Sequence, residues 1–162
     1  MNSVGDGQLT FQFSAAERVE QILSQYPDKR SATLPLLHLA QEQVGYLTSA
    51  AIETVAELVE VHPGEIMDTV SFYTMFYTKP KGRNHIQVCQ TLSCSLNGAD
   101  SLVDHISEKY KIAPGEVSQD GKISLVKVEC LGSCDTAPVI RINDSYYEGM
   151  TVEKFDKIVE SF

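Results

Sequence analysis

Cys89-Gln-Thr-Leu-Ser-Cys94 and Cys130-Leu-Gly-Ser-Cys134 contain all four cysteines of the chain. Each stretch is a short loop with a cysteine at both ends. Paired cysteines in a reducing compartment typically bind metal or carry out redox chemistry, because disulfides are rare there. A chain of 162 residues can bury a core without disulfide staples. We therefore expect the fold to bring these two loops together.

The residues around each loop predict how the loops are positioned. Residues 85–89 alternate in polarity as a strand does, and residues 123–128 predict a second strand. A helix is expected between them over residues 97–111, and a hairpin over 139–147, before a last helix capped by Thr151. If the two strands are parallel neighbours, both loops emerge at one edge of the sheet, where four sulfur atoms converge. This order of elements predicts an α/β domain of the thioredoxin type.

The residues before this domain predict helices. Residues 14–80 contain four short amphipathic segments with short links, the pattern of a small helical bundle. Ser14 and Glu17 have the spacing of a capping box, which predicts the start of the first helix. Gly45 is a natural end for the second helix, and Thr48 or Ser49 is a candidate cap for the third.

Three parts are therefore expected: a flexible tail over 1–13, a helical bundle over 14–80 and an α/β domain over 81–162. The boundary falls in Lys79-Pro-Lys-Gly-Arg83, a basic stretch whose proline and glycine break helices.

Composition excludes several classes of function. The net charge of -9 argues against nucleic-acid binding, which usually requires a basic surface. No stretch approaches the ~18 apolar residues that span a bilayer. Residues 1–13 contain no Lys or Arg and no apolar core of a signal peptide. We expect a cytoplasmic protein with no direct membrane insertion.

Cys89, Cys94, Cys130 and Cys134 are the candidate metal ligands. Two close pairs of thiolates suit a [2Fe-2S] cluster, because each of its two irons takes two protein ligands. A structural zinc ion also accepts four cysteines at such spacings. Two disulfides would need an oxidising compartment, and thiol–disulfide exchange normally uses C-x-x-C, which neither pair has.

Other residues and missing motifs refine this interpretation. Ser93, Ser95 and Ser133 lie next to the cysteines, so their hydroxyls are candidates for hydrogen bonds to the sulfur atoms. The sequence has neither G-x-G-x-x-G nor G-x-x-x-x-G-K-[ST], so it shows no nucleotide or flavin site of its own.

The motifs resemble a known family. Cys89-x4-Cys94 followed by Val-Glu-Cys130-Leu-Gly-Ser-Cys134-Asp-Thr-Ala-Pro138 is similar to the small thioredoxin-like [2Fe-2S] subunit of NADH:quinone oxidoreductase, the 24 kDa-type (E-type) component of respiratory complex I. Ser71-Phe-Tyr-Thr-Met-Phe76 and Tyr147-Glu-Gly-Met-Thr151 look like further runs of that family. The resemblance extends over nearly the whole chain from about residue 14.

The resemblance implies an α/β chain in which an N-terminal four-helix bundle precedes a thioredoxin-like [2Fe-2S] ferredoxin domain. It implies that Cys89, Cys94, Cys130 and Cys134 ligate one [2Fe-2S] cluster. It also implies a cis proline at Pro138, since thioredoxin-like folds often carry one before a central strand.

The same resemblance implies an electron-transfer subunit of an NADH dehydrogenase complex, which is a non-catalytic redox subunit of an enzyme. Its cluster would exchange electrons with FMN in a partner subunit that also binds NADH. The complex would hold it peripherally, on the cytoplasmic side of the inner membrane. Alternative interpretations are the equivalent diaphorase subunit of an NAD-reducing hydrogenase or NAD-dependent formate dehydrogenase, and a structural zinc module.

Overall fold

The structure, a computed structural model, describes residues 11–160. The chain divides into two compact units, Met1–Pro80 and Lys81–Phe162, each with its own buried apolar cluster. Most of the predicted tail, and Phe162, lie outside the described residues.

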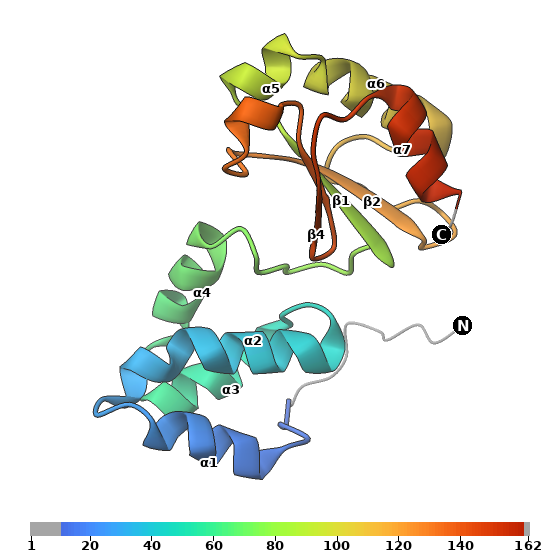
Figure 1. The fold of residues 1–162 in the computed structure, drawn as a ribbon. Coiled ribbons are helices and arrows are strands. Elements are labelled where there is room, and N and C mark those ends of the chain that lie inside the picture. The colour runs from blue at the N-terminus through green and yellow to red at the C-terminus, as the bar shows by residue number, and fades with distance from the viewer. Residues whose placement is uncertain (1–10, 161–162) are drawn as a thin grey trace. The chain divides into compact units, whose positions relative to one another are not determined.

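The N-terminal unit is helical in its described part (Figure 1). Its elements are α1 (Ala16–Ser24), the 3-10 turn η1 (Lys29–Ala32), α2 (Thr33–Val44), α3 (Ser49–Val59) and α4 (Pro63–Phe72). Each α-helix contributes apolar side chains to one cluster, among them Val19, Leu36, Val55 and Ile66. This burial holds the short helices, which are marginal in isolation.

At some helix ends the cap predicted from local sequence forms, and at another a tertiary contact replaces it. The Thr48 side chain accepts a hydrogen bond from the Ala51 N–H at 3.1 Å, and Gly45 ends α2 with a left-handed φ of 92°. Both were predicted. The capping box predicted at Ser14 does not form. Ser14 instead donates its N–H and hydroxyl to the Gln43 side chain, at 2.9 and 3.1 Å, because that residue of α2 offers an acceptor.

The C-terminal unit is a layer of helices on a four-stranded sheet (Figure 1). Its elements are β1 (Asn84–Cys89), α5 (Leu92–Leu96), α6 (Ala99–Tyr110), β2 (Ile123–Val128), the 3-10 turn η2 (Cys134–Thr136), β3 (Ile140–Ile142), β4 (Ser145–Tyr147) and α7 (Val152–Val159). The strand order is β2-β1-β3-β4.

Strands β1 and β2 are parallel neighbours, as predicted, with Cys89 opposite Val128 in the register. Strand β3 lies antiparallel on the other side of β1 and pairs with β4 as a hairpin. The carboxyl ends of β1 and β2 therefore lie at the same edge of the sheet, and each is followed by a cysteine loop.

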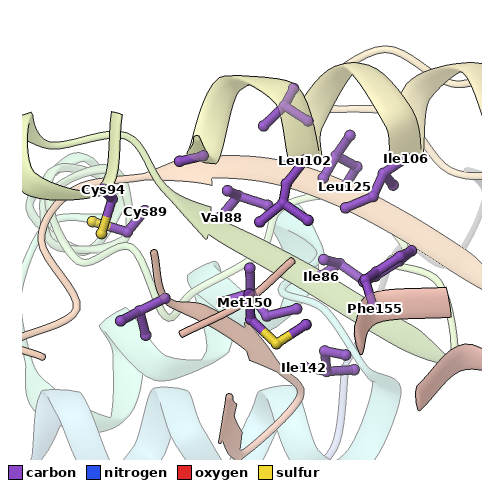
Figure 2. Packing of buried hydrophobic residues seen from close by; sticks show 14 of the residues in the cluster. Ile86, Val88, Cys89, Cys94, Leu102, Ile106, Leu125, Ile142, Met150 and Phe155 are labelled. Carbon is purple, nitrogen blue, oxygen red and sulfur yellow. The ribbon is translucent and has the colours of Figure 1, made fainter. Parts of the chain in front are cut away.

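The core of this unit lies between the sheet and its helices. Figure 2 shows Ile86 and Val88 of β1 packed with Leu102 of α6 and Phe155 of α7. Residues 86 and 88 share one face of the strand because side chains alternate. Phe155 is fully buried. The core thereby holds β1, whose last residue is Cys89, in a fixed position.

Polar contacts join α6 to α7 at the surface of this layer. Asp156 accepts hydrogen bonds from Lys109 at 2.6 Å and from His105 at 2.9 Å. These two bonds, with Lys109 contributing most, hold the pKa of Asp156 below its usual value.

Helix α5 was not predicted. The expected helix began at residue 97, whereas the structure has α5, a break at Gly98 with φ of 98°, and then α6. Five residues are too few to show helical periodicity. The Ala137–Pro138 bond is cis, as predicted. Among residues 11–160, no helix is both long and apolar enough to cross a bilayer.

Gly82 is a site where we predict a large steric effect. An added Cβ would lie 2.5 Å from the Ser124 nitrogen and closer still to the Ile123 carbonyl carbon, and these backbone atoms of β2 are held in place by the pairing with β1. We expect Gly82→Ala to lower the free energy of unfolding by about 1–3 kcal/mol, the usual cost of overpacking. Urea unfolding of the wild type and the variant measures this change in the free energy of unfolding.

Gly64→Ala is the matched control for this substitution. Its Cβ would meet Nδ1 of the exposed His62 ring at 3.0 Å, and a shift of that ring weakens the hydrogen bond that Nδ1 accepts from the Gly64 N–H at the start of α4. The higher helix propensity of alanine, about 1 kcal/mol over glycine, offsets this loss, so we expect a net change within about 0.5 kcal/mol. Equal effects of the two substitutions would contradict the close approach of Gly82 to β2.

Candidate metal centre

The first cysteine pair is buried at the end of β1. Cys89 is the last residue of the strand, and Cys94 lies in α5 directly afterwards; their exposed fractions are 1% and 2%. Figure 2 shows their sulfur atoms close together at this end of the strand. The turn into α5 brings Cys94 back over Cys89.

The second pair lies in the loop after β2 and is exposed. The sulfur atoms of Cys130 and Cys134 are 3.4 Å apart, well beyond the ~2.05 Å of a disulfide bond. Gly132, with a φ of 88°, reverses the chain between them and donates its N–H to the Cys130 sulfur at 3.4 Å. Glycine suits this position because it adopts positive φ without steric cost.

The two pairs converge. Helix α5, which carries Cys94, contacts η2, which begins at Cys134. The Leu131 N–H of the second loop lies near enough to the Cys89 sulfur of the first to lower the pKa of that thiol. The Thr91 hydroxyl of the first loop likewise lowers the pKa of Cys130 in the second. Polar groups of each loop therefore face a sulfur atom of the other.

Two of the four thiols ionise more readily than a free cysteine. Burial opposes ionisation of Cys89, but hydrogen bonds from the Thr91 side chain and N–H and from the Leu131 N–H outweigh it and lower its pKa. The Gly132 N–H is the main reason that the pKa of Cys130 is lowered. Thiolates, not thiols, bind metal.

The other member of each pair ionises less readily. Burial raises the pKa of Cys94, and the neighbouring Cys130 raises the pKa of Cys134 through a hydrogen bond and through charge repulsion. Ionising all four thiols at this edge of the sheet therefore costs free energy, and a bound metal cation would offset that cost.

These residues fit a [2Fe-2S] cluster. The thiols are free, they form two pairs, and backbone N–H groups of Leu131, Gly132 and Val139 are directed at the sulfurs. Such donors accompany iron–sulfur ligation. A two-iron cluster needs only two thiolates on each iron.

Sequence reasoning partly missed the groups around the sulfurs. Ser95 was a predicted sulfur donor, but its hydroxyl donates to Asp100 at 2.8 Å. The oxygen that contacts a sulfur belongs to Thr91, which lies 2.9 Å from Cys89. The signal that the sequence offered was only the position of Thr91, two residues after the first cysteine.

The C-terminal unit has a thioredoxin-like fold, and its four free thiols are suited to hold an iron–sulfur cluster. Residues 19–162 match the family described as thioredoxin-like [2Fe-2S] ferredoxin, and the chain belongs to this family. Its cofactor is accordingly one [2Fe-2S] cluster.

The chain is also similar to curated proteins over most of its length. It is 49% identical over 144 residues to the E subunit of NADH-quinone oxidoreductase from Rickettsia bellii, covering 87% of this chain and 86% of that protein. It is 47% identical over 131 residues to the protein called subunit 2 of NADH-quinone oxidoreductase from Thermus thermophilus, covering 80% and 72%.

A solved structure with the same fold is that of an NAD+-reducing [NiFe]-hydrogenase in the air-oxidised state. The TM-score is 0.69 at 26% identity, over 79% of this chain. The match spans only 22% of the hydrogenase chain, so it concerns one part of a larger protein.

Proposed function

We propose that this chain is the electron-transfer subunit of an NADH dehydrogenase complex of the NADH-quinone oxidoreductase type. It holds one [2Fe-2S] cluster, and its partner is the subunit that binds FMN and NADH. The chain itself is a non-catalytic redox subunit of that enzyme. It lies peripherally on the cytoplasmic side of the inner membrane, held there by the complex.

One observation carries this proposal: two cysteine pairs follow neighbouring parallel strands at one edge of the sheet, and α5, which carries Cys94, contacts η2, which begins at Cys134. The relatives that are E subunits of NADH-quinone oxidoreductase support the larger assignment, since the chain covers most of their length.

Cys89, Cys94, Cys130 and Cys134 are the proposed ligands. When bound, a [2Fe-2S] cluster accepts and releases one electron at a time. The chain supplies the four thiolates, and the apolar residues behind the buried pair shield that side from water. The exposed pair forms the side that a partner reaches. Because one cysteine pair is buried and the other is exposed, the cluster would be open to electron exchange on the side of the exposed pair.

The two units have separate proposed roles. Residues 81–162 hold the cofactor, and residues 14–80 form a four-helix bundle that contributes to binding the partner. The bundle contains none of the proposed ligands.

Metal analysis and EPR of the full chain test the cofactor. We expect a brown protein with about two irons and two inorganic sulfides per chain, and an EPR signal on reduction. A colourless, EPR-silent protein with about one zinc per chain would instead identify the zinc module. Co-purification with the flavin subunit tests the partner.

The likeness to the hydrogenase structure favours one alternative, a diaphorase subunit of an NAD-reducing hydrogenase. An NAD-dependent formate dehydrogenase is the related case. Neighbouring genes distinguish them, because genes for a quinone-reducing membrane arm, a hydrogenase or a formate dehydrogenase identify the complex.

Two exposed leucines mark where we expect the flavin subunit to bind. Leu92 and Leu96 lie one helical turn apart on α5 and are 74% and 77% exposed. They flank Cys94, so a partner covering them would approach the cofactor closely. Exposed apolar side chains beside a functional site typically mark an interaction surface.

We expect the variant with both Leu92→Glu and Leu96→Glu to bind the flavin subunit at least about tenfold more weakly, since each substitution would bury an unpaired negative charge in the interface. The measurement is titration calorimetry with the purified flavin subunit. Val117→Glu is the control, because Val117 is 38% exposed and pairs with Ser124 near the opposite end of β2. Wild-type affinity of the double variant would place the interface elsewhere.

A further inference from the structure

Thr91 occupies a position where its side chain is expected to cap a helix but does not. It is the residue before α5 and has the extended backbone of an N-cap, with φ of -73° and ψ of 164°. Threonine at an N-cap usually accepts a hydrogen bond from a backbone N–H of the first turn. Thr48 and Thr151 make this bond in α3 and α7, whereas Thr91 makes none in α5.

The Thr91 hydroxyl is directed at sulfur instead. Its oxygen lies 2.9 Å from the Cys89 sulfur, and it also interacts with the Cys130 sulfur. It thus lies between the two cysteine pairs. A thiolate has no proton, so in the metal-bound state the hydroxyl is the only possible donor of this bond.

We propose that the Thr91 hydroxyl raises the electron affinity of the bound cofactor by donating a hydrogen bond to the Cys89 sulfur. Thr91 is then a positioning residue that acts through its neighbouring cysteine. The inference rests on the proposed function, because it requires the cluster to be bound by these cysteines.

The charge on the ligand sulfurs determines the direction in which the Thr91 hydrogen bond shifts the reduction potential. Adding an electron makes the ligand sulfurs more negative, and a donor bond stabilises the more negative state more strongly. Hydrogen bonds to the sulfurs are therefore among the features that set the reduction potential of an iron–sulfur cluster. A hydrogen bond becomes stronger as its acceptor becomes more negative. The bond to the Cys89 sulfur is therefore stronger in the reduced state, and this difference in bond strength changes the measured reduction potential.

Thr91 also offers a cleaner test than its neighbours. The other donors to these sulfurs include the N–H groups of Leu131, Gly132 and Val139, which a side-chain substitution leaves in place. Thr91→Val removes the hydroxyl and keeps the shape of the side chain, whereas Thr91→Ser keeps the hydroxyl. The two variants separate hydrogen bonding from packing.

The experiment is a redox titration of the full chain with its cluster, followed by EPR. We expect Thr91→Val to shift the midpoint potential to a more negative value, with electron affinity reduced up to about tenfold, which is about 59 mV for one electron. Thr91→Ser should keep the wild-type potential. Thr136→Val is the control, because Thr136 is also two residues from a proposed ligand but bonds the Ser133 carbonyl at 3.3 Å.

The outcomes separate this inference from the proposed function. A wild-type chain that assembles no cluster contradicts the proposed function. A wild-type potential in a cluster-loaded Thr91→Val overturns this inference alone. If Thr91→Val assembles no cluster, Thr91→Ala replaces it and the same criterion applies. If neither assembles while Thr91→Ser does, the hydroxyl serves assembly and its role in tuning is rejected.

Discussion

The Cys134→Ala variant is expected to lose the visible absorption and the EPR signal of the cluster completely while remaining folded. Removing one of four ligands leaves an iron with a single protein thiolate. Cys134 is exposed, so its loss creates no cavity in the core. Alanine is the appropriate replacement because it cannot supply a substitute ligand. Absorption spectra, iron content and far-UV circular dichroism together measure the effect.

Ser133→Ala is the matched control for this variant. Ser133 directly precedes Cys134, and its carbonyl rather than its hydroxyl accepts a hydrogen bond from Thr136. We expect this variant to keep its iron and its colour. A Cys134→Ala protein with full iron content and an unchanged EPR signal would remove Cys134 from the ligand set.

The Phe155→Ala variant is expected to lose about 3–5 kcal/mol of the free energy of unfolding of the C-terminal unit. Phe155 is fully buried and packs in the cluster that includes Ile86 and Leu102. Its removal costs the transfer free energy of the ring and leaves a cavity behind the sheet. Total protein stability is commonly only about 5–15 kcal/mol, so the loss is a large part of it. Urea unfolding followed by far-UV circular dichroism measures the change.

Phe72→Ala provides the comparison for the same substitution at the surface. Phe72 is 77% exposed in the helical unit, so its truncation should change stability by no more than about 0.5 kcal/mol. A loss below about 1 kcal/mol in Phe155→Ala would contradict the burial of α7 against the sheet.

Much of the C-terminal fold follows from local sequence. The strand at residues 85–89, predicted from its alternation, and the strand predicted at 123–128 match β1 and β2 to within one residue. The Thr151 cap of the last helix also forms, with a bond from the Lys154 N–H. These features depend on residues close in sequence, which is why the sequence reveals them.

Features that depend on tertiary contacts were missed. Ser14 matched a capping box, but Gln43 of another helix supplies its partner. The arrangement around the sulfurs was missed for a similar reason. The cysteines were evident from their spacing, whereas the orientation of the Thr91 hydroxyl depends on where α5 begins, and five residues carry too weak a pattern to predict that.

The parallel pairing of β1 with β2 has a consequence for how this centre varies among proteins. The two loops are positioned by strand register, with Cys89 opposite Val128. The chain between them packs α6 into the core and then reaches β2 through residues 113–122, which are largely exposed. Long surface insertions cost little closure entropy. That exposed connection can therefore lengthen without displacing a thiol. Genome searches that allow any separation between the two cysteine motifs should find members of this architecture that a fixed spacing overlooks.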